Sequence, residues 1–232
     1  MLLKKVVLSF FIGITGILLF STNGFCAPCY GTSQPEKKKF ILGLQTYSIF
    51  KRDLEKDYGR LRSLQHFLNL SWGILDWLCL DLKGGLGNIK QHPSTEDELD
   101  YNCSFAGGYG FRIKFYDDKN IKLVFGFQHI SVHPEVIKFD DIKNQAILDD
   151  WQVSLLGSYQ LKLFNPYLGL RWSRLDYIHK LNQERKRKMS DLSESLGLII
   201  GSDFYLTPKI FINLEAQFLD SKATALSINY KF

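Results

Sequence analysis

The sequence predicts an all-β protein, an antiparallel up-and-down transmembrane β-barrel of about ten strands, with eight strands as the other possibility. Three observations lead to this fold class. Apolar and polar residues alternate in most segments from residue 40 onward, which is the period of a strand with two different faces. Short turns and longer polar loops follow these segments in alternation. Aromatic residues make up 14% of the chain, and both strands and membrane interfaces favour them.

The composition restricts the chain to a few classes of protein. Hydrophobic residues make up 45% of the 232 positions, which excludes a disordered chain. A mean hydropathy of -0.10 excludes a bundle of membrane helices. The formal net charge of +5 is modest and the acids are spread along the chain, so no nucleic-acid partner is expected. The cysteine spacing matches no zinc site, and no metal or cofactor is expected.

The first 26 residues have the pattern of a secretory signal peptide. Two lysines precede an apolar core over residues 6–20, which is short for a membrane-spanning helix. Small and polar residues then lead to Cys26, near which we expect cleavage. A lipid anchor on Cys26 is the alternative, but the bulky Phe25 before it disfavours a lipoprotein signal. We therefore expect an exported chain in which residues 27–39 form a flexible periplasmic lead-in and residues 40–232 form the barrel.

Each expected strand has one apolar and one polar face. In the second, for example, Leu68 and Leu70 oppose Asn69 and Ser71. The expected strands are residues 40–50, 65–74, 78–86, 104–115, 121–132, 151–163, 168–173, 195–204, 210–218 and 224–232. Short turns are expected at 75–77, 117–120, 165–166 and 207–208, and long loops at 51–60, 91–102, 133–149 and 179–191.

The last strand carries Ile228, Tyr230 and the terminal Phe232 on its apolar face. A closing strand that ends on an aromatic residue, together with an even number of strands and short turns on one side, resembles the small bacterial outer-membrane β-barrels. The resemblance implies that these three residues are a signal for the barrel assembly machinery. It also implies a monomer in the outer membrane, surrounded by outer-membrane lipid and lipopolysaccharide.

An apolar exterior assigns the charged residues of the strands to the interior. A dry apolar core would make these charges prohibitive, so we expect an ion-paired lumen that plugs the barrel, with a narrow channel as the alternative. The expected lumen network is Asp81, Lys83, Arg112, Lys114, Lys122, Lys162, Arg171, Asp203, Glu215 and Lys231.

His129 and Ser131 share one face of the strand over residues 121–132. A histidine beside a serine hydroxyl is the basis of nucleophilic acyl chemistry, in which an acid orients the base. The segment His129-Ile-Ser131 resembles the active-site segment of lipid A 3-O-deacylases, which are small barrels that act on acyl chains at the outer leaflet. The resemblance implies Ser131 as nucleophile, His129 as base and Glu135 or Asp140 as the orienting acid.

Two further patterns concern the long loops. The basic run Arg185, Lys186, Arg187 and Lys188 suits the phosphates of lipopolysaccharide, and a solvated loop is the plain alternative. The acidic pair Asp149 and Asp150, with His133, supplies the residue types that a protease of the omptin class would need.

Export permits disulfide bonds, and Cys29 with Cys79 is the candidate pair. Taken together, the sequence favours a structural or surface-interaction protein with a plugged lumen. A lipid-A-modifying acyl hydrolase is the first alternative, and a narrow channel is the second.

Overall fold

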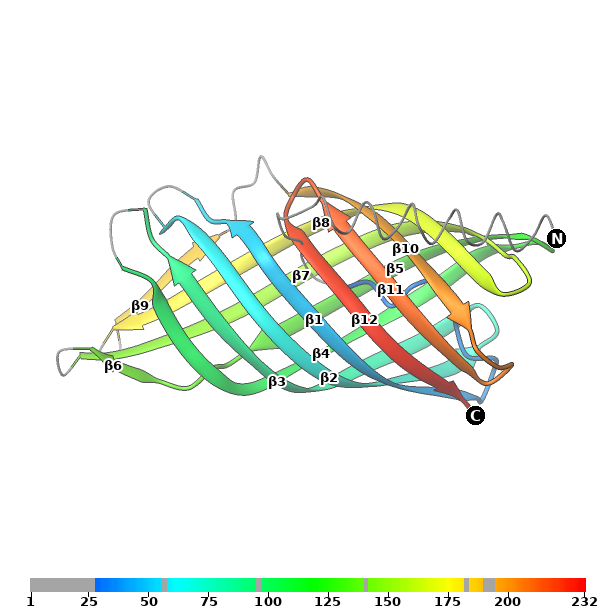
Figure 1. The fold of residues 1–232 in the computed structure, drawn as a ribbon, viewed down its shortest axis with the longest axis horizontal. Helices are drawn as coiled ribbons and strands as arrows, with labels where there is room; N and C mark the ends of the chain where they lie inside the picture. The colour runs from blue at the N-terminus through cyan, green and yellow to red at the C-terminus, as the bar shows by residue number, and fades with distance from the viewer. Residues whose placement is uncertain (1–27, 56–57, 95–96, 140–141, 182–183, 190–194) are drawn as a thin grey trace.

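The structure, a computed structural model, describes residues 28–55, 58–94, 97–139, 142–181, 184–189 and 195–232. Ten long strands form a closed antiparallel barrel, and two short strands extend hairpins at one end (Figure 1). This ring of ten strands confirms the fold class that the alternation predicts. Among the described residues, no helix has the length and apolar character needed to cross a membrane.

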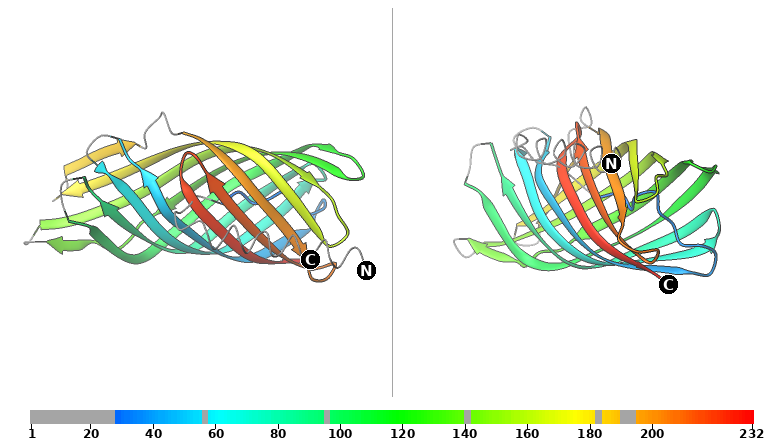
Figure 2. Two further views of the ribbon diagram at one scale, coloured as in Figure 1. Left: turned by 45° about the horizontal axis from the view of Figure 1, so that its top comes forward. Right: turned by 45° about the vertical axis from the view of Figure 1, so that its right-hand side comes forward.

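Each barrel strand pairs with the next strand of the ring. The barrel strands are β1 (Phe40–Asp53), β2 (Arg60–Leu75), β3 (Leu78–His92), β4 (Leu99–Asp117), β5 (Ile121–Val132), β7 (Ile142–Tyr159), β8 (Phe164–Leu181), β10 (Leu196–Tyr205), β11 (Ile210–Phe218) and β12 (Lys222–Lys231). The short strands are β6 (Ile137–Phe139), which pairs with β7, and β9 (Glu184–Met189), which pairs with β8. The strands are tilted to the long axis of the barrel (Figures 1 and 2).

The last strand closes the ring on the first. Leu44 pairs with Ile228 and Leu42 with Tyr230, and the backbone N–H of Phe232 donates to the carbonyl of Phe40 at 3.0 Å. The three residues that the sequence marks as an assembly signal therefore lie where β12 meets β1. Ile228 and Tyr230 pair with residues of both β1 and β11, and Phe232 follows the last residue of β12.

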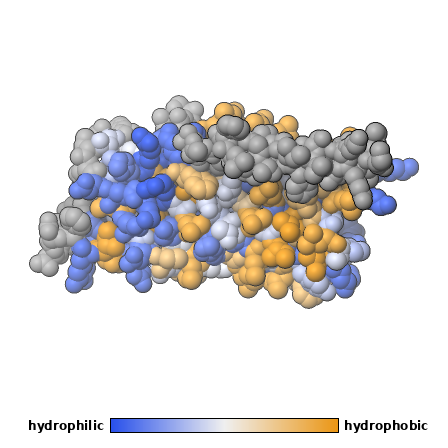
Figure 3. Space-filling view, in the orientation of Figure 1, coloured by the Kyte–Doolittle hydropathy of each residue, from blue (hydrophilic) through white to orange (hydrophobic). Residues whose placement is uncertain are grey.

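The two faces of the wall have the polarity of a barrel surrounded by lipid. In β1, outward Leu44 is 62% exposed, whereas inward Gln45 is 4% exposed. Exposed large apolar side chains, mostly leucine, tryptophan and phenylalanine, recur on the outside of the long strands, although β5 contributes only Ile121 and β11 contributes none. Apolar residues cover the strands, and hydrophilic residues gather toward the end that carries β6 and β9 (Figure 3). Such an apolar band with a polar interior is the pattern of transmembrane barrels.

The boundary between β7 and β8 differs from the predicted one. The turn lies at residues 160–163, before Asn165 and Pro166, which the sequence analysis takes as the turn itself. Pro166 is the third residue of β8, beyond the last pair that links β7 to β8. A proline is tolerated at the start of a strand because no ladder hydrogen bond needs its missing N–H.

The lumen is filled in two layers. The half nearer the long loops is an apolar core that includes Tyr47, Ile49, Ile130, Leu148 and Tyr177. The half nearer the short turns holds polar and charged side chains around residues 28–35, which we call the N-terminal segment. The half nearer the short turns therefore has the polar and charged filling that the sequence predicts. The other half is filled mainly by apolar side chains, with a smaller set of buried charges that includes Arg52 and Asp150.

The N-terminal segment lies inside the barrel. Cys29, Thr32 and Ser33 are buried, and the chain leaves the lumen at Glu36, whose carbonyl accepts from the N–H of Lys39 at 3.0 Å. This placement differs from the flexible periplasmic lead-in expected for residues 27–39. The composition of residues 27–39, with two prolines and a lysine run, contains no period that would mark residues 28–35 as a buried element.

The cysteines give a chemical test of this placement. Cys29 and Cys79 are buried free thiols, so the disulfide considered between them is not formed, and Cys103 is exposed. We expect a maleimide to label Cys103 in the folded protein and to label Cys29 and Cys79 only after unfolding. Mass spectrometry of the labelled peptides measures this order, and labelling of Cys29 as fast as Cys103 would contradict the insertion of the segment.

Candidate functional site

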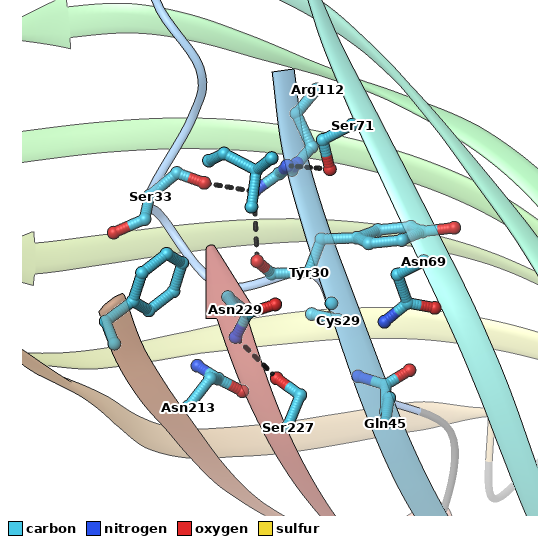
Figure 4. Close-up of a pocket in the computed structure, with 13 residues that line it drawn as sticks. Cys29, Tyr30, Ser33, Gln45, Asn69, Ser71, Arg112, Asn213, Ser227 and Asn229 are labelled. Atoms are coloured by element: carbon cyan, nitrogen blue, oxygen red, sulfur yellow. Dashed lines mark hydrogen bonds between the residues drawn. The ribbon is translucent and has the colours of Figure 1, made fainter. Parts of the chain in front are cut away.

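Arg112 holds the N-terminal segment in the lumen. Its guanidinium donates to both carboxylate oxygens of Asp81, at 2.9 and 2.8 Å. Nη1 also donates to the carbonyls of Tyr30 at 2.9 Å and Ser33 at 2.7 Å. Such a two-pronged contact with a carboxylate is specific to arginine. Tyr30, Ser33 and Arg112 lie together among polar side chains of the surrounding strands (Figure 4).

Three more of the predicted lumen residues contact this segment. Ser33 Oγ donates to Asp203 at 2.7 Å, and Glu215 accepts from the backbone N–H of Cys29 at 2.7 Å. The ammonium of Lys83 lies 4.0 Å from the centre of the Tyr30 ring, a cation–π distance. The structure therefore brings Asp81, Lys83, Arg112, Asp203 and Glu215 together around one peptide segment.

Arg171 belongs to a second ionic cluster. Its Nη2 donates to Asp220 at 2.6 Å, and Arg52 Nη1 donates to the same carboxylate oxygen at 2.8 Å. Arg52 and Asp220 are not among the predicted lumen residues, because Arg52 falls in the expected loop 51–60 and Asp220 falls between two expected strands. A register shift between Ile49 and Arg52 turns the Arg52 side chain inward, and a bulge of this kind leaves little trace in the alternation.

Four predicted lumen residues do not join either cluster. Lys114 forms an ion pair with Asp117 near a short turn, and Lys122 is half-exposed near the start of β5. Lys231 lies over the ring of Tyr205, 4.6 Å from its centre. Lys162 is an error of the sequence analysis, because it is exposed in the turn over residues 160–163. Its assignment to the lumen followed from extending the alternation of β7 past the end of that strand.

The lumen leaves little free space in the described part of the barrel. Cavities beside Cys29 and Arg112 have volumes of ≈ 20 and ≈ 10 Å³, and one in the apolar half has ≈ 10 Å³. A space of this size holds about one water molecule. These three cavities are therefore too small to pass a solute at their positions.

A polar cluster lies on the outer face of the wall. Ser131 Oγ is 2.8 Å from Nε2 of His133 and donates to Oδ1 of Asp149 at 2.5 Å. Nε2 of His129 lies 3.6 Å from the same Asp149 oxygen. Ser131 and Asp149 are direct partners in the β5–β7 register, and both alternate with buried neighbours, so they point outward. The cluster joins a hydroxyl, two imidazoles and a carboxylate.

Aromatic rings fix the two histidines. The ring of His129 lies 4.0 Å from the Trp151 ring and 5.4 Å from the Tyr109 ring, centre to centre. His133 follows the end of β5, and its backbone N–H donates to the carbonyl of Phe105 at 2.8 Å. The β4 and β7 strands therefore hold the histidines on either side of Ser131.

The cluster lies at one edge of the apolar band. Ser131 follows Ile121, the first residue of β5 at a short turn, by ten positions. A tilted strand crosses the hydrocarbon layer in about 9–11 residues, so Ser131 reaches the interface on the side of the long loops. Charged groups on the lipid face cost several kcal/mol at the midplane but only about 0–1 kcal/mol at this depth.

Comparisons with known proteins found distant similarities. No family model matches the sequence. The major outer membrane porin, serovar C, of Chlamydia trachomatis is 22% identical over 125 residues, which cover 36% of this chain and 32% of the porin. The match thus spans about a third of the porin's length.

Solved structures of similar fold are outer-membrane barrels. The COG4313 outer membrane channel from Pseudomonas putida F1 has a TM-score of 0.47 at 9% identity, over 89% of this chain and 100% of that one. The outer membrane protease OmpT from Escherichia coli has a TM-score of 0.43 at 10% identity, over 84% and 95%. Ail, the attachment invasion locus protein of Yersinia pestis, has 0.42 at 10%, over 84% and 99%.

The chain has the fold of a small bacterial outer-membrane β-barrel. The closed ring of ten strands, the apolar outer face and the polar lumen carry this assignment.

In this barrel, the predicted catalytic residues are only partly brought together. Ser131 and His129 lie in one cluster, but the histidine in contact with Ser131 is His133. Glu135 is exposed, and only its backbone N–H has a described bond, to the carbonyl of Asn102 at 3.1 Å. The carboxylate of the cluster is instead Asp149. The pairing of β5 with β7 brings it there, and the sequence gives no local signal for that register.

Other sequence-predicted sites are separate or fall outside the described residues. Asp150 points into the lumen, where it accepts from Ser173 Oγ at 2.7 Å, so the acidic pair is divided between the two faces of the wall. Asp140 lies outside the described residues. The basic run 185–188 lies in β9, and its side chains are outside the part of the chain that the structure describes.

Proposed function

We propose that this barrel is an outer-membrane acyl hydrolase that cleaves ester-linked acyl chains of outer-leaflet lipids, with Ser131 as the nucleophile. The observation that carries the proposal is the Ser131 hydroxyl, which contacts His133 Nε2 at 2.8 Å and Asp149 at 2.5 Å on the outward face. A serine beside a histidine and a carboxylate is the arrangement that activates a hydroxyl for acyl transfer.

The chemistry follows from the contacts. The Ser131 hydroxyl first turns its proton from Asp149 to His133 Nε2, and Ser131 Oγ then attacks the ester carbonyl carbon while that proton passes to the imidazole. The tetrahedral intermediate then expels the alcohol, which takes that proton and leaves an acyl-serine. Water, deprotonated by His133, hydrolyses the acyl-serine and releases the fatty acid. Asp149 accepts from Ser131 and lies 3.6 Å from His129 Nε2, so its negative charge beside the cluster stabilises the imidazolium formed in each half of the reaction.

The depth of the cluster supports a lipid substrate. Lipid esters lie at the boundary between headgroups and hydrocarbon, and Ser131 faces outward at that boundary, where no soluble substrate needs to enter the barrel. The local resemblance of His129-Ile-Ser131 to lipid A 3-O-deacylases suggests lipid A as the substrate. The native protein, reconstituted with lipid A, is expected to release fatty acid detectable by mass spectrometry, and no release would refute the proposal.

A structural or surface-interaction role is the second candidate. The observation that favours it is the lumen, which an apolar core fills in one half and the N-terminal segment fills in the other. A barrel packed in this way acts as a rigid support for its loops. This candidate predicts that the Ser131 cluster is inert, so the fatty-acid assay separates it from the hydrolase.

The packed lumen also leads to a prediction about conductance. We expect the native protein to give no single-channel steps in planar bilayers, because the described lumenal cavities hold only about one water molecule each. Removal of residues 28–35 is expected to leave the bilayer silent as well, since the apolar core still seals the other half. Steady ion conductance by the native protein would instead support a channel.

A further inference from the structure

A row of outward positions connects Ser131 to a groove on the lipid-facing wall. Strand pairing places Ser131 beside Gly107, Gly107 beside Gly84, and Gly84 beside Leu68. The row continues through Leu44 on β1 and Ile228 on β12. All of these positions point outward. Neighbouring strands lie about 4.8 Å apart, so two glycines form a strip beside the nucleophile, in which the Phe105 ring lies over Gly107 and Gly84 is open.

The strip opens into an apolar groove. A Cβ added at Gly84 would meet no atom within 4 Å. Beyond Gly84, a groove of ≈ 580 Å³ crosses the outer face of β3, β2, β1 and β12. Its outward lining includes the leucine and isoleucine side chains Leu44, Leu68, Leu86, Ile212, Leu226 and Ile228. Thr46 and His66 are the polar side chains on this outer wall, and they hydrogen-bond to each other at 3.1 Å.

The row descends into the membrane as it leaves Ser131. Ser131 lies ten positions above the short-turn end of β5, Leu44 lies four positions above the start of β1, and Ile228 lies three positions from the end of β12. This descent follows from the tilt of barrel strands. The groove therefore begins at Gly84, two strands from Ser131 along this row, and runs toward the hydrocarbon layer.

We propose that this groove binds one acyl chain of an outer-leaflet lipid and holds its ester at Ser131. The groove is continuous with the lipid-facing band of the barrel, so a chain enters it from the bilayer without crossing water. Its descent from the nucleophile matches the direction of a lipid tail. This inference rests on the proposed hydrolase for the role of Ser131, but binding of the chain is measured without catalysis.

The binding test uses Ser131→Ala protein in lipid A vesicles that contain a lipid A with a diazirine at the acyl-chain terminus. After illumination, we expect at least tenfold more label on Leu44, Leu68 and Leu226 than on Leu155 and Leu170, which face lipid elsewhere. A parallel arm with diazirine-labelled phosphatidylethanolamine is expected to label all of these positions evenly. Even labelling by lipid A as well would overturn the proposal, and groove labelling by the phospholipid would reassign the occupant.

A blocked groove gives the matched variant. Gly84→Phe fills open space, has no unusual backbone angle to strain, and is expected to remove the preferential labelling. Gly157→Phe is the control, because Gly157 faces outward on β7 and a Cβ there meets only the Leu123 side-chain end within 3.4 Å. Labelling that persists in Gly84→Phe would contradict the groove.

The same variant separates the two proposals. In otherwise native protein, Gly84→Phe is expected to lower kcat/KM at least tenfold for long-chain esters, whereas Gly157→Phe is expected to leave it unchanged. Preferential labelling without any ester hydrolysis by the native protein would sink the hydrolase and keep the groove. Hydrolysis by the native protein together with even labelling would sink the groove and keep the hydrolase.

Discussion

Replacing Ser131 with alanine is expected to reduce fatty-acid release from lipid A by at least about 10³-fold, because the acyl-serine cannot form. Release is measured by mass spectrometry on the reconstituted protein. Ser48→Ala is the control, since Ser48 is also a half-exposed outward serine but lies on β1, away from the cluster. Ser48→Ala is expected to retain native activity. Equal activity of native and Ser131→Ala proteins would rule out Ser131 as the nucleophile.

The histidines test the roles assigned by the structure. His133→Ala is expected to reduce the rate about as much as Ser131→Ala, because residues that act as a unit lose activity together. His129→Ala is expected to have a smaller effect, since its ring contacts Asp149 and not Ser131. Glu135→Ala is expected to leave the rate unchanged. A larger loss in His129→Ala than in His133→Ala would restore the assignment that the sequence alone suggests.

Arg112→Ala is expected to destabilise the barrel by about 3–5 kcal/mol, because it leaves the buried Asp81 carboxylate without its partner. Urea unfolding, followed by the gel shift between folded and heat-unfolded barrel, measures the loss. Arg112→Lys is expected to restore only part of it, since an ammonium cannot contact both Asp81 oxygens and the segment carbonyls together.

Lys114→Ala is the matched control for Arg112. Lys114 also points inward on β4, two positions away, but pairs with Asp117 near the turn, where an exposed ion pair contributes about 0–1 kcal/mol. Faster maleimide labelling of Cys29 is expected in Arg112→Ala and not in Lys114→Ala. An Arg112→Ala protein with native stability and a protected Cys29 would mean that Arg112 does not hold the segment.

The outer wall was more predictable than the lumen. Alternation identifies outward Leu68 and inward Asn69 without any knowledge of neighbours, because side-chain direction depends only on position within the strand. Arg52 escaped this reasoning, since a bulge in β1 reverses the alternation just before it. The apolar half of the lumen was missed for another reason. Ile130 and Leu148, for example, face inward at alternating positions that elsewhere hold polar residues, and no pattern in the sequence distinguishes them.

The sequence predicted that His129 and Ser131 lie together, but not that His133 and Asp149 lie beside Ser131. The period-two spacing of His129 and Ser131 put both on one face, and the structure places them there. His133 follows the last residue of β5, where backbone pairing with Phe105 fixes its direction. Asp149 lies 18 positions along the chain from Ser131 and reaches it through the β5–β7 register. Long-range register depends on how the whole ring closes, which no local pattern contains.

By itself, the sequence determined a barrel of about ten strands, its apolar outer face and the positions of its short turns, apart from the turn between β7 and β8. These features are local, since they follow from alternation and turn residues within each strand and its connections. Only the tertiary structure decided that residues 28–35 occupy the lumen, that Arg112 holds them, and that Ser131 meets His133, Asp149 and a strip of glycine backbone. These contacts join residues far apart in the chain, because the tilt and closure of the barrel determine which strands meet at each depth.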